Sequence, residues 1–258
     1  MQKLFIKNRD GVKLAVVIEE ALSQKGLAFV MHGQGGFKEQ PHVRTFIEAF
    51  KEREYAVVSF DTANTIGESG GKFEDASITS YYADLEDVIE WSKSQKWYQE
   101  PFTLSGHSLG GICTALYAEN NPEKIKGVAP ISPVISGKLS WETHSPEELE
   151  EWKRTGWKTS PSNSKPGIIK KLKWSNMEDR LKYDLLPKTD KLTMPVLIIV
   201  GEEDTGTPPK HQKIFFDKIP GDKKELHIIK GAPHTFRDPE HLKEIKEIFI
   251  KWIDKLVK

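Results

Sequence analysis

LSGHSLGGICTA, residues 104–115, is the stretch of this sequence that decides the fold. It contains a G-x-S-x-G motif, Gly106-His107-Ser108-Leu109-Gly110, with apolar residues on both sides. Such a motif lies where a strand ends, the chain turns sharply and a helix begins, which leaves the serine hydroxyl exposed at the apex. We therefore expect Ser108 at the tip of a tight turn that Gly106 and Gly110 allow to close.

The residues on either side of the motif favour this interpretation over an ordinary small-residue turn. Residues 101–104 are typical of a short strand, and residues 112–118 of a small-residue helix that ends near Asn120-Asn121-Pro122. The sequence therefore predicts the strand, turn and helix that the motif requires.

Strand and helix patterns alternate along the rest of the chain. The sequence predicts an N-terminal hairpin and further apolar strands, with amphipathic helices over 43–53, 78–92 and 240–256 between or after them. The predicted strands are 2–7, 12–18, 27–31, 56–60, 101–104, 127–131, 196–200 and 226–229. This order predicts an α/β fold with a mostly parallel, doubly wound sheet of about eight strands.

About sixty residues separate Ile131 from Pro195, which is too many for an ordinary connection. We interpret residues 137–186 as a cap insertion after the sixth strand, with residues 1–136 and 187–258 forming the core. Two interpretations of its tryptophans stay open: they hold a small cap together, or some of them face a substrate pocket beneath it. These tryptophans are Trp141, Trp152, Trp157 and Trp174.

A reactive serine needs a base and a group that orients the base. His234 follows the last predicted strand, so it lies at the same sheet edge as the turn of residues 106–110. Asp204, in the loop after strand 196–200, is the expected acid, with Glu203 and Glu202 as alternatives. The sequence thus predicts Ser108, His234 and Asp204 as a catalytic triad.

Two backbone N–H groups are expected to bind the oxyanion that forms when a serine attacks a carbonyl. One belongs to Leu109, which directly follows the serine at the start of a helix. The other belongs to Gln34 in the glycine-rich loop His32-Gly33-Gln34-Gly35-Gly36 after the third strand. We expect His32 to brace this loop.

Composition restricts the partners. The 258 residues include 38 basic and 38 acidic side chains, so the zero formal charge gives no attraction to nucleic acid or to an anionic membrane. Cys113 is the only cysteine, and no leader-like or 18-residue apolar run occurs, which favours a cytoplasmic protein. No metal or cofactor motif occurs, so no cofactor is expected, and either a monomer or a homodimer fits.

Four motifs in order give a resemblance to a known family: HGQGG at 32–36, GHSLGG at 106–111, GEEDTGTP at 201–208 and GAPHTF at 231–236. Together they resemble the α/β-hydrolase superfamily over essentially the whole chain. FDTANTIGESGGKFED, residues 60–75, is similar to a loop of the cinnamoyl and feruloyl esterases and of the serine aminopeptidase-like hydrolases. The resemblance implies a serine carboxylesterase acting on a small-molecule ester of a small to medium acyl or aromatic acid.

Two departures limit what the resemblance implies about the substrate. Thr65-Ile66-Gly67 replaces the usual Gly-His-Gly of the fourth-strand loop, and Leu109 stands where cinnamoyl esterases often have glutamine. An aminopeptidase or amidase, a thioesterase or an acyltransferase would use the same triad, and an amine-binding anchor could come from Glu147, Glu148, Glu150 and Glu151. A ligand-binding homologue without turnover is the alternative from another class.

Overall fold

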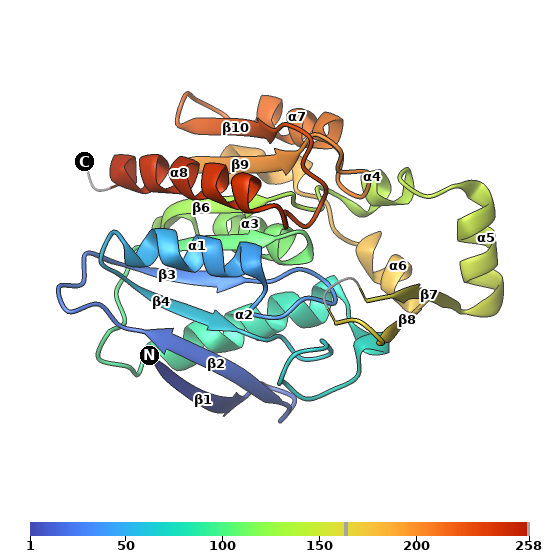
Figure 1. Ribbon diagram of the computed structural model, residues 1–258, viewed down its shortest axis with the longest axis horizontal. Coiled ribbons are helices and arrows are strands. Elements are labelled where there is room, and N and C mark those ends of the chain that lie inside the picture. Colours follow the sequence, from blue (N-terminus) through green and yellow to red (C-terminus); the bar gives the residue numbers. More distant parts are fainter. Residues whose placement is uncertain (163–164, 257–258) are drawn as a thin grey trace.

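The computed structural model describes residues 1–162 and 165–256 and places one large sheet between two layers of helices (Figure 1). The predicted mostly parallel sheet is confirmed: eight strands lie in the order β1-β2-β4-β3-β5-β6-β9-β10, and only the β1–β2 and β2–β4 pairs are antiparallel. The strands are β1 Gln2–Lys7, β2 Lys13–Glu19, β3 Gly26–Met31, β4 Tyr55–Phe60, β5 Phe102–His107, β6 Ile125–Ile131, β9 Val196–Gly201 and β10 Lys224–Ile229.

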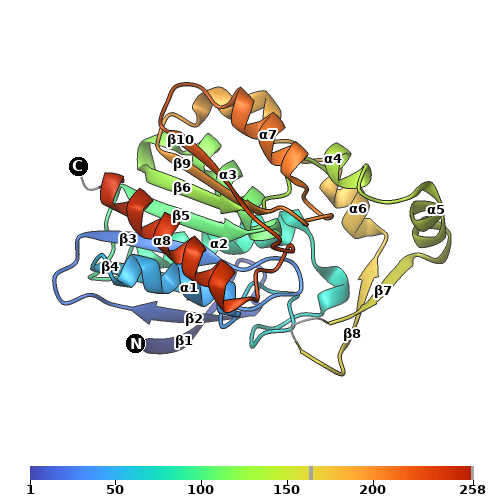
Figure 2. The same cartoon turned by 45° about the horizontal axis from the view of Figure 1, so that its top comes forward.

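Helices cover both faces of the sheet. α1 and α8 pack on one face, and α2, α3 and α7 on the other, as Figure 2 shows from a second angle. The central strands are therefore apolar on both sides: in β3, Phe29 and Met31 join one apolar cluster while Ala28 and Val30 join the other. The helices are α1 Pro41–Lys51, α2 Ile78–Ser92, α3 Leu109–Asn120, α7 Pro209–Lys218 and α8 Pro239–Leu256, with short 3₁₀ helices at Phe73–Asp75, Pro122–Lys124 and Leu186–Lys191.

The segment 137–186 leaves the sheet after β6 and gathers beside the carboxyl ends of the parallel strands (Figures 1 and 2). We call it the 137–186 segment. Its described residues form three helices and an antiparallel hairpin, and residues 163–164 lie outside the described range. Its elements are α4 Gly137–Trp141, α5 Pro146–Thr155, β7 Trp157–Pro161, β8 Ile169–Lys173 and α6 Ser175–Arg180.

Aromatic side chains form the small core of the 137–186 segment. The Trp174 ring lies 5.5 Å from the Trp152 ring and 5.8 Å from the Trp141 ring, both edge to face. Trp152 is 2% exposed and donates its indole N–H to the Leu172 carbonyl at 3.1 Å. Trp157 is largely exposed, so three of the four indoles hold these helices and strands together.

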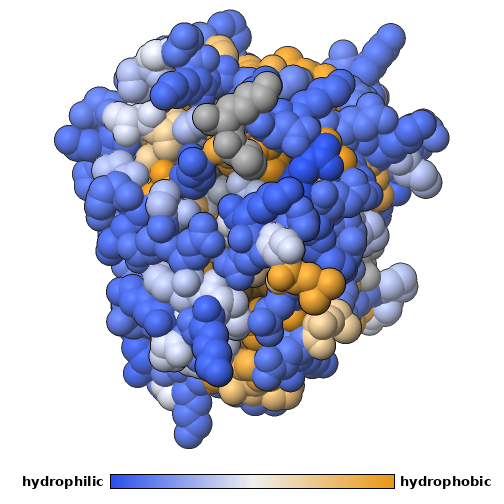
Figure 3. All heavy atoms as spheres, turned by 90° about the vertical axis from the view of Figure 1, so that its left-hand side faces the viewer, coloured by the Kyte–Doolittle hydropathy of each residue, from blue (hydrophilic) through white to orange (hydrophobic). Residues whose placement is uncertain are grey.

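The face at the amino ends of the parallel strands is mostly hydrophilic, with small separate apolar areas (Figure 3). Across residues 1–162 and 165–256, no helix combines the length and the hydrophobicity that crossing a bilayer requires.

Candidate active site

Ser108 occupies a strained turn between β5 and α3. Its φ of 54° and ψ of −111° are unusual for a residue with a side chain and cost of order 1–3 kcal/mol. Glycines on both sides make the turn possible: a Cβ on Gly106 would lie 2.3 Å from the Gly110 carbonyl oxygen, and one on Gly110 would lie 2.4 Å from the His32 carbonyl oxygen. The Ser108 N–H donates to Ile131 of β6 at 2.9 Å, which fixes the turn on the sheet.

The structure brings Ser108, His234 and Asp204 together from three loops at the carboxyl end of the sheet. His234 Nε2 lies 3.0 Å from Ser108 Oγ, and His234 Nδ1 lies 2.7 Å from Asp204 Oδ2. Both distances suit hydrogen bonds. The two alternative acids are exposed, and Glu202 instead accepts the Gly231 N–H at 2.9 Å. Asp204 is thus the carboxylate that contacts the imidazole.

Asp204 is almost fully buried and richly hydrogen-bonded. Its Oδ1 accepts the N–H groups of Gly206 at 3.0 Å and Thr207 at 2.8 Å, and the Thr207 hydroxyl lies 2.8 Å from Oδ2. Burial alone would raise the Asp204 pKa, but the bonds from His234 and Thr207 outweigh it and lower the pKa below its usual value. The carboxylate therefore stays ionised beside the imidazole.

Two further histidines, His107 and His42, lie beside His234. His107 Nε2 lies 2.8 Å from the His234 carbonyl oxygen and so donates to it. The His107 ring lies 4.7 Å from the His234 ring and 4.4 Å from the His42 ring. Burial lowers the His107 pKa well below its usual value and the His42 pKa to about 3, so both stay neutral. The only sequence signal for this support was the position of His107 next to the serine.

The glycine-rich loop 32–36 lies against the serine turn. A Cβ on Gly33 would lie 3.0 Å from Ser108 Cβ, so only glycine permits this approach. His32 braces the loop as expected: its Nδ1 donates to the Gly33 carbonyl at 2.7 Å and its Nε2 accepts the Thr62 N–H at 3.1 Å. Among the described residues, the N–H groups of Gln34 and Leu109 donate to no protein acceptor. Both remain available to a ligand.

A buried ion pair holds loop 32–40 against loop 61–71. Lys38 Nζ lies 2.9 Å from Asp61 Oδ2, and both side chains are almost fully buried. Asp61 also accepts the N–H groups of Lys38 and Glu68, each at 2.8 Å, and the Thr65 hydroxyl donates to the Gly36 carbonyl. Residues of the 60–75 motif therefore position the loop that carries Gln34.

The tryptophans of the 137–186 segment have different positions. Trp152 lines a cavity of about 190 Å³ together with Gln34, whereas Trp141 lines a separate outer cavity with α5. Trp157 and Trp174 line neither of these two cavities. The structure thus brings one of the four indoles, Trp152, beside the loop that faces Ser108.

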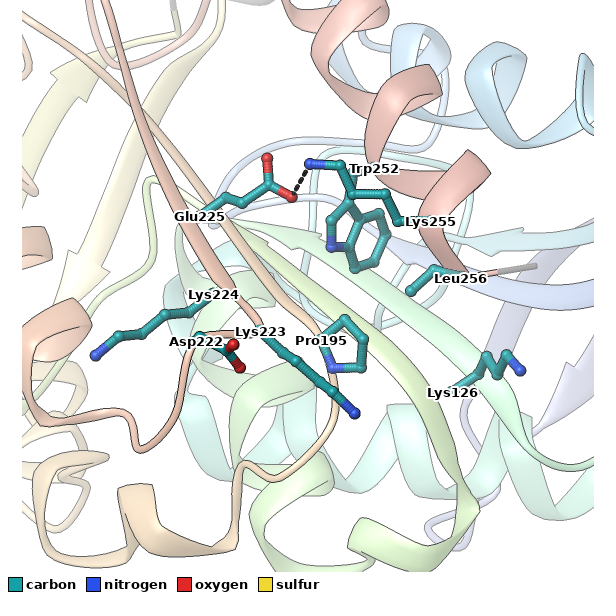
Figure 4. Close-up of a pocket in the computed structure, with 9 residues that line it drawn as sticks. All are labelled: Lys126, Pro195, Asp222, Lys223, Lys224, Glu225, Trp252, Lys255 and Leu256. Carbon is teal, nitrogen blue, oxygen red and sulfur yellow. Dashed lines mark hydrogen bonds and ion pairs between the residues drawn. The ribbon is translucent and has the colours of Figure 1, made fainter. Parts of the chain in front are cut away.

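A cavity of about 550 Å³ lies at the amino end of the sheet, far from Ser108. Figure 4 shows its lining, with the Trp252 ring from α8 and Pro195 before β9 beside the ion pair between Lys255 and Glu225. The cavity is not lined by Ser108, His234 or Asp204. The residues that suit nucleophilic chemistry therefore lie at the opposite edge.

Within residues 1–162 and 165–256, no three His, Cys, Asp or Glu side chains form a group that could hold a metal ion. Cys113 is buried in α3, and burial raises its thiol pKa well above the usual value. A buried thiol with a raised pKa does not suit nucleophilic chemistry, so Cys113 is not a candidate for it.

The fold and this arrangement at the carboxyl end of the sheet define an α/β hydrolase. The sequence profile of the serine aminopeptidase family S33 matches residues 23–166 and 173–240. The chain belongs to this family of α/β hydrolases.

Curated and solved relatives include esterases and lipases. A thermostable monoacylglycerol lipase of Bacillus sp. (strain H-257) is 25% identical over 236 residues, 84% of this chain and 88% of that protein. The ferulic acid-bound structure of Est1E from Butyrivibrio proteoclasticus has a TM-score of 0.83 at 22% identity, over 98% and 99% of the two chains. A monoacylglycerol lipase of Paleococcus ferrophilus has a TM-score of 0.71 at 24% identity, over 95% and 98%.

Proposed function

We propose that the protein is a serine carboxylesterase that cleaves small-molecule esters of small to medium acyl or aromatic acids. The observation that carries the proposal is the continuous hydrogen-bonded chain from Ser108 Oγ through His234 to Asp204, with distances of 3.0 and 2.7 Å. Similarity to the Bacillus monoacylglycerol lipase, 25% identical, supports an ester as the substrate. The membership in a hydrolase family supports the same reaction type.

The proposed reaction passes through an acyl-enzyme. His234 takes the Ser108 proton as Oγ attacks the carbonyl carbon, and Asp204 stabilises the imidazolium that forms. The N–H groups of Gln34 and Leu109 bind the developing oxyanion, and each such donor is typically worth about 3 to 4 kcal/mol. His234 then gives its proton to the leaving alcohol. A water molecule then attacks the acyl carbon and gives a proton to His234, and His234 passes this proton to Ser108 Oγ as the bond to the acyl carbon breaks and the acid is released.

The 137–186 segment is proposed to act as the cap of this site, between core parts 1–136 and 187–258. Its position beside the carboxyl ends of the strands supports this role (Figure 2). It also contacts the core around the site: Arg180 donates to Gln34, Asn176 donates to the Ala76 carbonyl at 2.7 Å, and Asp179 accepts from Thr79. A substrate between the segment and Ser108 would be partly shielded from water.

An aminopeptidase activity is the second candidate, because the family description names serine aminopeptidases. A free amino terminus would need a carboxylate anchor. The exposed glutamates of α5 do not form one near Gln34: Glu148 completes a capping box with Ser145, and Glu151 pairs with Arg154. These contacts favour a solvated helix face, so the ester reaction stays the first choice.

Hydrolysis of matched substrates by purified protein tests the proposal. We expect turnover of 4-nitrophenyl esters from acetate to octanoate or of methyl ferulate, and at least 1,000-fold slower turnover after Ser108→Ala. Ser94→Ala, at an exposed serine in the turn just after α2, is the matched control and should keep parental rates. Equal rates for Ser108→Ala and the parent would refute the assignment. Parallel assays with aminoacyl anilides, thioesters and an added alcohol acceptor separate peptidase, thioesterase and acyltransferase activity.

A further inference from the structure

The cavity of about 190 Å³ beside Gln34 has a cationic wall. Lys158 of β7 and Lys170 of β8 face it from the hairpin, and Arg180 faces it from the end of α6. Lys158 lies opposite Leu172 and Lys170 opposite Ser160 in the hairpin register, so all four share one face of the hairpin. No aspartate or glutamate lines the cavity.

These three cations have no acidic partner. In the part of the chain that the structure describes, no carboxylate lies within 4.0 Å of the charged nitrogens of Lys158, Lys170 or Arg180. Arg180 donates only to neutral acceptors: Asn176 Oδ1 at 2.9 Å, Ser140 Oγ at 2.9 Å and Gln34 Oε1. Lys38, the buried lysine of loop 32–40, is by contrast paired with Asp61.

Burial makes this arrangement unfavourable without a ligand. It lowers the pKa of Arg180 to about 10 and the pKa of both lysines below the usual value, and Arg180 lowers the Lys158 pKa further by repulsion. Two carboxylates outside the cavity partly oppose these shifts: Glu148 raises the Lys158 pKa and Asp179 raises the Arg180 pKa. Both carboxylates already have other hydrogen-bond partners, because Asp179 accepts from Thr79 and Glu148 accepts from Ser145. The Arg180 guanidinium, with a pKa of about 10, is charged at neutral pH.

The cavity also adjoins the proposed reaction centre. Gln34 lines it, and the preceding residue Gly33 packs on Ser108. Because Gln34 Oε1 accepts from Arg180, its amide Nε2 is oriented as a donor, and this buried atom has no hydrogen-bond partner among the described residues. A buried donor without a partner has lost its hydrogen bonds to water, and a bound acceptor would replace them.

We propose that this cavity binds an anionic group, a carboxylate or a phosphate, carried by the ester whose carbonyl reaches Ser108. The inference rests on the proposed esterase function and specifies its substrate class as acidic esters. The anion takes no part in the bond changes: Ser108 accepts the acyl group, the alcohol leaves with the His234 proton, and water hydrolyses the acyl-enzyme. The cations and the Gln34 amide fix the orientation of the substrate.

Half-esters of dicarboxylic acids test the proposal against neutral esters of equal length. Mono-4-nitrophenyl succinate, adipate and suberate are compared with 4-nitrophenyl butanoate, hexanoate and octanoate. At one chain length, the parent should cleave the half-ester with a kcat/KM about tenfold higher, and Lys158→Met or Lys170→Met should each lower this ratio about five-fold. Lys171→Met removes the same charge from the exposed face of β8 and should keep the parental ratio.

Arg180→Met is expected to abolish the preference, and Arg180→Lys to restore part of it. Because Arg180 also holds Gln34, its loss could disturb both substrates, so the lysine variants decide the matter. Equal loss for both substrates in these variants, or a ratio of one in the parent at every length, would overturn the proposal.

Calorimetry with the Ser108→Ala variant separates this inference from the esterase function. Free adipate and inorganic phosphate are titrated into that variant with and without Lys158→Met. If either anion binds and its affinity falls about five-fold on Lys158→Met, the result supports an anion site in this cavity even if no ester is cleaved. Comparison of the adipate and phosphate titrations shows whether the site prefers a carboxylate or a phosphate. Absence of binding of both anions, together with normal hydrolysis of neutral esters, overturns the anion site and leaves the esterase function intact.

Discussion

Asp204 on the core and Arg180 on the 137–186 segment are two charged side chains at the same end of the sheet, with opposite surroundings. Asp204 contacts His234, Gly206 and Thr207, and these contacts lower its pKa so that its charged form is favoured. Arg180 contacts only neutral acceptors, and burial lowers its pKa so that its charged form is disfavoured.

The difference separates two kinds of preorganisation. Around Asp204 the protein itself supplies the hydrogen-bond partners, so the arrangement of Ser108, His234 and Asp204 exists without a ligand. Around Arg180 the protein leaves positive charge uncompensated beside a cavity, and a ligand would supply the missing partner. Three substitutions at other buried groups and at Asp204 test how the partners of a buried ionisable group determine activity and stability.

The largest effect is expected for Asp204→Asn. An asparagine would present the wrong hydrogen-bonding group to His234 Nδ1 and favour the wrong tautomer, so kcat should fall about 10⁴-fold while the fold is retained. Steady-state hydrolysis of a 4-nitrophenyl ester measures this. Glu203→Gln, which changes an exposed neighbouring carboxylate in the same way, should leave kcat within two- to threefold of the parent. The reverse result would assign the acid to Glu203.

Glu119 is a buried carboxyl group whose surroundings differ from those of both Asp204 and Arg180. Both Glu119 oxygens in α3 are buried without a hydrogen bond among the described residues, and burial raises the Glu119 pKa from 4.5 to about 8. The folded state then keeps a proton that the unfolded chain loses, so stability falls as pH rises from about 4.5 to about 8.

Glu119→Gln should remove this loss. The variant is expected to match the parent near pH 4.5 and to exceed it by up to about 5 kcal/mol of unfolding free energy at pH 8.5, from 3.5 pKa units at 1.36 kcal/mol each. Urea unfolding at both pH values measures it. A constant difference between the two proteins across this range would show that Glu119 does not titrate this way.

The smallest effect is expected for Thr207→Val. The substitution removes the hydroxyl 2.8 Å from Asp204 Oδ2 and keeps the backbone N–H that binds Oδ1. Losing one of several hydrogen bonds to a buried carboxylate should lower kcat/KM about tenfold. Thr205→Val, at an exposed position in the same loop, is the control and should have little effect. An unchanged rate for Thr207→Val would mean that Asp204 does not need this donor.

The sequence predicted the eight-stranded sheet because its central strands are buried on both sides and therefore continuously apolar, as in Val196–Gly201. It missed α7, whose apolar residues Ile214, Phe215 and Phe216 are consecutive and show no helical period. The proline and acidic residues at 146–151 do indicate the start of a helix, which is α5, but α4, α6 and the hairpin of the 137–186 segment were not predicted. These elements pack through contacts between indole rings, and their sequences show no hydrophobic periodicity that would predict them.

The positions of Ser108, Asp204 and His234 followed from sequence because each residue lies in the turn or loop after a parallel strand of one sheet, and these strand ends share an edge. The supporting contact of His107 with the His234 carbonyl could not be predicted, since it depends on side-chain direction after the turn. The sequence also could not predict the cationic cavity wall formed by Lys158, Lys170 and Arg180. In a chain with 38 basic residues, only the folded hairpin register and α6 show which of them share a cavity.

Labelling with a fluorophosphonate, followed by mass spectrometry of the digested protein, tests directly whether Ser108 is the nucleophile. We expect a single adduct in the parent protein, on the peptide that contains Ser108. Its formation should be strongly slowed in His234→Ala, and the adduct should be absent in Ser108→Ala. An adduct on a different serine, or an unlabelled Ser108 in a protein that still hydrolyses esters, would contradict it.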